Sequence, residues 1–152
     1  MTRKMLLGAL AGMMMVCCMA AAAQEKGIWQ AASNTAQSIT GDVVFSPDKI
    51  TIDFSSFTIA RIRDLEPGEL RAVFDAEDAG GSGSLYRLNV PSAKRFLHKN
   101  TLCGEEDTQW MATYVAGGSL KVAFFSGLKP PALTLDAINN STDLCGTFSY
   151  VR

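Results

Sequence analysis

The sequence predicts an all-β domain: an antiparallel barrel of about eight strands, with a β-sandwich as the alternative. Apolar and polar residues alternate with a period of two through much of the chain, and helical periodicity is scarce after the first 23 residues. Turns rich in glycine and proline separate segments of ordinary strand length. Strands that follow one another through short turns favour a barrel, because closure removes exposed sheet edges.

Residues 1–23 are predicted to be a signal peptide, and residues 24–152 a single β-barrel domain. Arg3 and Lys4 precede an apolar run, and four consecutive alanines then come before the first acidic residue, Glu25. The apolar run is shorter than the ~20 residues that a membrane-spanning helix needs. We therefore expect the chain to be exported, to the periplasm or outside the cell, with no stable membrane insertion once the leader is removed.

The small residues at the end of the leader place the expected cleavage after Ala22 or Ala23. Cys17 and Cys18 would then leave with the leader. Lipid attachment at one of these two cysteines is the alternative.

Strand-like segments follow one another along the rest of the chain. The clearest runs from 49 to 54, where Ile50, Ile52 and Phe54 share one face. The strongest hairpin signal is Gly117-Gly118, which lies between two apolar segments. The predicted strands are 27–32, 43–45, 49–54, 57–62, 70–74, 85–90, 110–115, 119–125 and 145–151.

The connections between these strands show few helical signals. One short helix is expected near 91–98, because Pro91 suits a first helical turn. Residues 78–84 are predicted to be a flexible hairpin tip, since glycines and serines dominate that stretch. Residues 134–141 are expected to form a loop or one helical turn.

Two tripeptides of the same sequence carry the remaining cysteines, at Cys103 and Cys145. In an exported domain we expect these cysteines to form a disulfide, with two free buried thiols as the alternative. Such a bridge would close a loop on the order of 40 residues and stabilise the fold by about 4 kcal/mol. A zinc site is not expected, because two cysteines and one histidine, His98, do not complete four ligands.

Gly27-Ile28-Trp29 begins the first predicted strand of the mature chain, and Arg152 lies at the end of the last. With these residues the chain resembles the calycin superfamily of lipocalin-like barrels. The resemblance implies that Trp29 closes one end of a barrel and that Arg152 packs over its ring, as a cation–π contact would favour. In size the chain is similar to small bacterial periplasmic inhibitors with such barrels, although the metalloprotease inhibitors of that group carry their bridge nearer the start.

No catalytic constellation is evident, and no cofactor or metal is expected. His98 is the only histidine, and no Gly-x-Ser-x-Gly motif is present. An enzyme of unrecognised type, centred on Glu105, Glu106 and His98, is the least favoured hypothesis. Because the leader carries two basic residues and no acidic one, its removal takes the net charge from −1 to −3. This balance does not suit nucleic acid binding.

The leading hypothesis is a non-enzymatic binding protein, an inhibitor or protein-interaction module that acts on an unknown protein partner through its loops. The alternative is a carrier of a small apolar ligand or lipid. The candidate interaction residues are Asp78, Gly80, Gly81, Glu105, Glu106 and Asp107. The candidate pocket residues for the carrier are Trp29, Trp110 and Tyr114.

Overall fold

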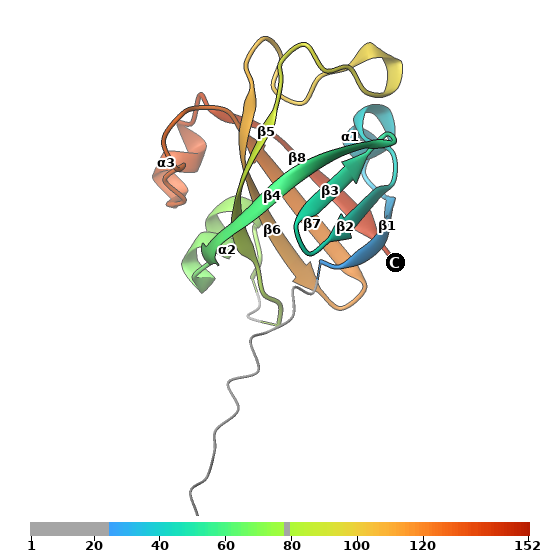
Figure 1. The fold of residues 1–152 in the computed structure, drawn as a ribbon. Helices are drawn as coiled ribbons and strands as arrows, with labels where there is room; N and C mark the ends of the chain where they lie inside the picture. The colour runs from blue at the N-terminus through green and yellow to red at the C-terminus, as the bar shows by residue number, and fades with distance from the viewer. Residues whose placement is uncertain (1–24, 78–79) are drawn as a thin grey trace, which may run out of the picture.

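The chain forms a closed antiparallel barrel of eight strands in sequence order, as seen in a computed structural model that describes residues 25–77 and 80–152 (Figure 1). Each strand pairs with the next, and the last returns to the first through Gln30–Val151 and Ala31–Tyr150. The predicted signal peptide lies outside the described residues. The strands are β1 Gly27–Ala31, β2 Val43–Ser46, β3 Lys49–Ile52, β4 Ser55–Asp64, β5 Ser84–Val90, β6 Thr108–Ala116, β7 Ser119–Phe125 and β8 Leu144–Val151.

Three short α-helices and one 3₁₀ turn interrupt the strand order. They are α1 Asn34–Ile39, α2 Pro67–Phe74, α3 Leu135–Asn139 and the 3₁₀ turn η1 Leu97–Lys99. The helix expected near 91–98 is thus only one 3₁₀ turn. Within the described residues, no helix has the length and apolar character needed to cross a membrane.

Helix α2 replaces a predicted strand at 70–74, and that prediction is wrong. Pro67 occupies the first helical turn, where a backbone N–H would have no acceptor within the helix, so its missing N–H costs no hydrogen bond. The Glu69 side chain accepts a hydrogen bond from the Glu66 backbone N–H at 2.9 Å, which satisfies one of the donors at the helix start. Asp75 ends the helix in the left-handed conformation.

The barrel interior is filled by aromatic and aliphatic side chains that alternate with outward-facing ones along each strand. Trp29, Phe124 and Phe148 are fully buried there, and the Phe124 and Phe148 rings meet edge to face at 5.3 Å. Other large side chains in this cluster are Phe45, Ile50, Ile52, Tyr86, Leu88, Met111, Leu120, Val122 and Tyr150.

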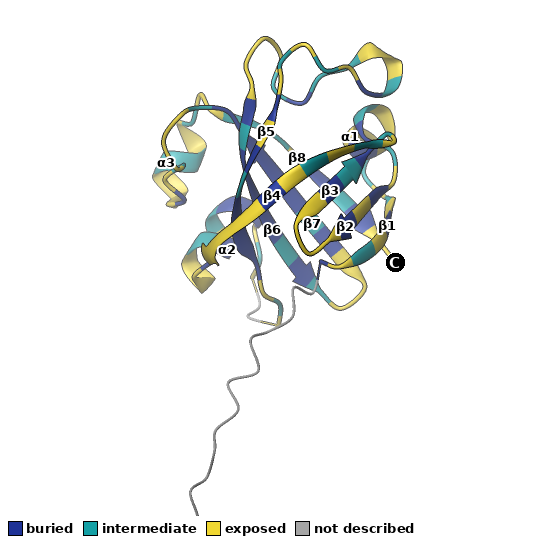
Figure 2. Cartoon of the chain, in the orientation of Figure 1, coloured by how far each residue is buried: buried dark blue, intermediate teal, exposed yellow. Residues whose placement is uncertain are grey.

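A second apolar cluster lies on the outer face of β5–β7, beneath α2 and α3. Leu85, Ala112 and Phe125 point outward from these strands and meet Leu70 and Phe74 of α2. The three strands are therefore buried on both faces, as the dark ribbon of β6 and β7 in Figure 2 shows. Strand β4 is instead mostly exposed (Figure 2).

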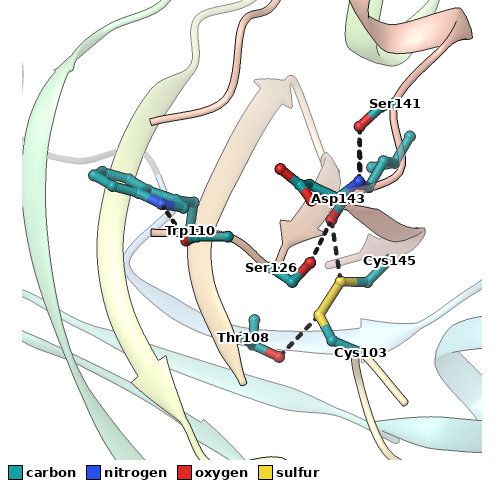
Figure 3. Close-up of a disulfide and its surroundings, with 9 residues drawn as sticks. Cys103, Thr108, Trp110, Ser126, Ser141, Asp143 and Cys145 are labelled. Atoms are coloured by element: carbon teal, nitrogen blue, oxygen red, sulfur yellow. Dashed lines mark hydrogen bonds between the residues drawn. A yellow bond between two sulfur atoms is a disulfide. The ribbon is translucent and has the colours of Figure 1, made fainter. Parts of the chain in front are cut away.

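The predicted pairing of Cys103 with Cys145 is confirmed. The bridge joins the segment before β6 to the start of β8, with 4.9 Å between the Cα atoms (Figure 3). Thr108 Oγ1 donates a hydrogen bond to Cys103 Sγ at 3.1 Å. Phe96 and Leu102, which precede the bridge, are buried in the barrel core. The disulfide thus fastens residues 91–107 over the barrel.

Trp29 and Arg152 make the contact that the lipocalin-like resemblance implies. The Arg152 guanidinium lies 4.2 Å from the centroid of the Trp29 ring, a distance suited to a cation–π interaction. The indole Nε1 of Trp29 donates to the backbone oxygen of Glu25 at 2.6 Å. Glu25 is itself buried and accepts a 2.6 Å hydrogen bond from Thr113. The two ends of the described chain are therefore tied together at the Trp29 ring.

Candidate binding groove at the Phe54 turn

A groove of about 370 Å³ opens on the outer surface where three distant segments meet. One wall is the loop between α1 and β2, the floor is the outward face of β2 and β3, and the far wall is η1. We call this feature the Phe54 groove. Its lining residues are Thr40, Gly41, Asp42, Val44, Thr51, Asp53, Phe54 and Leu97.

Phe54 lies at the tip of the β3–β4 hairpin and is fully exposed. The hairpin loop has only two residues, because Ile52 pairs directly with Ser55. Both loop residues have positive φ, 46° for Asp53 and 63° for Phe54, as in a type I′ turn, which favours Asn-Gly. The prediction that the strand runs to Phe54, on one face with Ile50 and Ile52, is therefore wrong, since the strand ends at Ile52.

The opposite wall of the groove also has left-handed backbone. His98 and Lys99 in η1 have φ values of 55° and 62°. Among the described residues, four of the five non-glycine residues with positive φ flank this groove. The fifth is Asp75, an ordinary helix end. A left-handed non-glycine residue costs on the order of 1 kcal/mol or more, and such strain clusters at functional sites.

The groove walls are held rigidly to the barrel. The His98 Nδ1 lies 3.1 Å from the Ser38 carbonyl oxygen, and the Asn100 amide donates to the same oxygen at 3.0 Å. The Thr40 and Tyr150 hydroxyls share a buried hydrogen bond of 2.8 Å. Burial raises the pKa of Tyr150 well above its usual value, so this hydroxyl stays protonated. These hydrogen bonds connect the groove walls to α1 and, through Thr40, to β8.

The predicted interaction loop at 78–84 is not a free hairpin tip over the part described. Asp78 lies outside the described residues, and Gly80 is exposed. Gly81 is packed against β6, where an added Cβ would lie 2.3 Å from the Val115 carbonyl oxygen. Ser82 pairs with Val115 through two backbone hydrogen bonds of 3.0 and 2.8 Å. Gly81 and Gly83 therefore allow close packing against β6, because an added Cβ at Gly83 would also lie only 2.0 Å from the Thr113 carbonyl oxygen.

The second predicted loop remains on the surface. Glu105, Glu106 and Asp107 are all exposed, and Asp107 accepts a hydrogen bond from the Ser92 backbone N–H at 2.8 Å. The described residues contain no group of three or more side chains suited to hold a metal ion. His98, the third residue of the enzyme hypothesis, lies beside α1, with its Nδ1 3.1 Å from the Ser38 carbonyl oxygen.

The three aromatic residues predicted for a ligand pocket lie on two different faces of the barrel wall. Trp29 is in the interior, whereas Trp110 and Tyr114 belong to the outer cluster. The Trp110 indole donates to the Gly127 carbonyl at 3.1 Å, and the Tyr114 ring stacks on Phe74 with 6.0 Å between centroids. The structure does not bring the three together.

The sequence pattern hides the Phe54 groove, because the apolar alternation of Ile50 and Ile52 continues across the turn to Phe54. The polar run Asp53 to Ser56, interrupted only by Phe54, was the available signal for a chain reversal. No protein-family model, curated protein or solved structure matches the chain.

The turn strain leads to a stability prediction. Replacing the turn with its favoured sequence, by Asp53→Asn and Phe54→Gly together, should raise the free energy of unfolding by about 1–2 kcal/mol. Urea denaturation measures the change. Phe54→Ala is the matched control: it removes the same exposed ring but keeps a Cβ at positive φ, so it should leave stability within about 0.5 kcal/mol. Equal stability of all three proteins would contradict a strained turn.

Proposed function

We propose that the protein is an exported, non-enzymatic interaction module or inhibitor that binds a protein partner through the Phe54 groove. The observation that carries the proposal is Phe54 itself: a large aromatic side chain that is fully exposed on a turn whose backbone disfavours it. Because the ring is not buried, it adds no hydrophobic stabilisation to the folded state. A side chain kept at a stability cost is typical of a functional position.

The shape of the site favours a protein over a small molecule. Phe54 projects from the surface, so its ring needs a concave partner in which to be buried. Aromatic side chains that fill a partner's pocket contribute much of the binding energy in protein interfaces. The adjoining groove would in turn receive a side chain of the partner.

The surface beside the groove extends the apolar area. Val44 lines the groove and pairs with Ile28 on the neighbouring strand. Both side chains point outward and are exposed, Ile28 at 66%. Together with Leu97 and Phe54 they give an apolar patch with Asp42 and Asp53 at its edge, the pattern of an apolar centre with a polar rim.

The filled interior favours binding on the outside. An eight-stranded barrel holds at most one small ligand, and only when its core side chains leave space. Here Trp29, Phe124, Phe148 and Tyr150 are fully buried within the barrel. The export expectation comes from the leader sequence and agrees with the disulfide.

Photo-crosslinking tests the proposal. The photoreactive analogue p-benzoyl-phenylalanine is placed at Phe54 and, as a matched control, at Ile62, an exposed apolar residue on β4 outside the groove. In cells that naturally express the protein, irradiation should give one protein adduct from position 54 and none from position 62. Excess unlabelled protein should suppress that adduct. Equal adducts from both positions, or none from position 54, would overturn the proposal.

A further inference from the structure

We propose that a second pocket, between α2 and α3, binds a small organic molecule that carries a carboxylate or phosphate group. The pocket measures about 380 Å³, within the range of small-molecule sites, about 300–1,000 Å³. It shares no lining residue with the Phe54 groove. Its lining residues are Arg71, Ala72, Val73, Phe74, Asp75, Lys121, Leu135, Asn139, Thr147 and Ser149.

Neighbouring strands form the floor of this α2–α3 pocket. Lys121 of β7 pairs directly with Ser149 of β8, and Thr147 lies two residues before Ser149, so all three side chains point to the same, outer face. Arg71 is on α2 and Asn139 is on α3. The two helices lie on the same side of the barrel in Figure 1.

Hydrogen-bond donors outnumber acceptors in this pocket. Arg71 and Lys121 are cations, and Asn139, Thr147 and Ser149 carry neutral groups that can also donate. The only acidic side chain in the lining is Asp75. A ligand that supplies acceptor oxygens and negative charge complements this set.

The two cations differ in how they are held, and both retain donors for a ligand. The Lys121 ammonium donates to the Phe74 carbonyl at 3.1 Å, which fixes its position and leaves two of its three N–H groups. The Arg71 guanidinium makes no side-chain hydrogen bond or ion pair within the described residues. Its planar fork matches a carboxylate or phosphate.

The rest of the lining suits the carbon part of the ligand. Leu135 of α3 is 63% exposed, and Val73 and Phe74 of α2 also border the pocket. A molecule with a small apolar body and an anionic end would cover Leu135 while its oxygens meet Arg71 and Lys121. Phenyl phosphate and benzoate have this chemistry, and inorganic phosphate has the charge alone.

Titration of the ¹⁵N-labelled protein with these three probes tests the inference, with chloride at equal ionic strength as reference. We expect saturable shifts in the amide signals of residues 71–75, 121, 139 and 147–149, with phenyl phosphate binding more tightly than inorganic phosphate. If benzoate alone binds, the ligand is a carboxylate; if phenyl phosphate alone binds, it is a phosphate ester.

Substitutions distinguish binding in the α2–α3 pocket from non-specific ionic attraction to the protein surface. Arg71→Gln should weaken phenyl phosphate binding by about tenfold. Arg95→Gln makes the same change at an exposed arginine outside the pocket and should leave binding within about twofold. Thr147→Val gives a second, neutral test and should also weaken binding. Equal effects of the two arginine variants, or no saturable shift with any probe, would overturn the inference.

Discussion

Trp29→Ala is expected to lower the free energy of unfolding by about 3–5 kcal/mol, the range for removing a large aromatic side chain from a core. The Trp29 side chain is fully buried, and its ring supports the Arg152 guanidinium 4.2 Å away. Its indole N–H also donates a hydrogen bond to the Glu25 backbone carbonyl. The substitution therefore leaves a cavity and releases both ends of the described chain. Urea denaturation followed by far-UV circular dichroism measures the loss.

Two further variants show which part of this effect belongs to the ring. Arg152→Ala removes the cation and should cost only about 1 kcal/mol. Trp29→Phe keeps an aromatic ring but loses the hydrogen bond to Glu25, and its stability should fall between those of wild type and Trp29→Ala. A loss under about 1 kcal/mol for Trp29→Ala would contradict the placement of this ring in the barrel core.

Removing the Cys103–Cys145 bridge is expected to lower the free energy of unfolding by about 4 kcal/mol. The bridge spans a sequence separation of 42 residues, so it restricts the unfolded chain strongly in the loop-entropy account. Unfolding of the wild type with and without a phosphine reductant measures the effect. The double variant Cys103→Ala/Cys145→Ala should resemble the reduced wild type and should not respond to reductant.

The disulfide also anchors the segment that forms one wall of the Phe54 groove. It fastens the segment that carries Phe96 and Leu102 in the core and Leu97 in the groove wall. Reduction should therefore speed amide hydrogen exchange around residues 96–102 more than in β2 and β3. If exchange rises equally everywhere, the bridge stabilises the fold globally and does not hold the groove wall.

The barrel, the bridge and the Gly117-Gly118 hairpin could be predicted because their signals are local. Alternation with period two marks several of the strands, and two glycines between apolar runs mark a tight turn. The pairing of the bridge could be predicted because only two cysteines remain after the predicted leader, so only one intramolecular pair is possible. The Trp29–Arg152 contact was implied by resemblance, and the structure has that contact.

Helix α2 shows why short amphipathic helices are difficult to predict from local sequence patterns. Leu70, Val73 and Phe74 are spaced at three and four residues, the spacing of one helical face. In a five-residue window the same residues also look like a strand. The outer cluster that they cover, on β5–β7, depends on tertiary packing and has no local signal.

The Phe54 groove could not be predicted because its walls come from three separate parts of the chain. Gly41, Val44 and Leu97 meet only after the barrel closes and residues 91–107 dock on α1. The exposure of Phe54 depends on the two-residue loop after Ile52. If the strand had continued through Phe54, this ring would have shared a face with Ile50 and Ile52.

The affinity of the partner found by crosslinking tests the central claim most directly, measured for wild type and for the Asp53→Asn/Phe54→Gly variant. Removing an aromatic anchor from the centre of an interface costs about 2 kcal/mol or more. We therefore predict that the variant binds about 30-fold or more weakly, although it unfolds at a higher urea concentration than wild type. A variant that binds the partner as tightly as wild type does would contradict the assignment of Phe54 as the binding site.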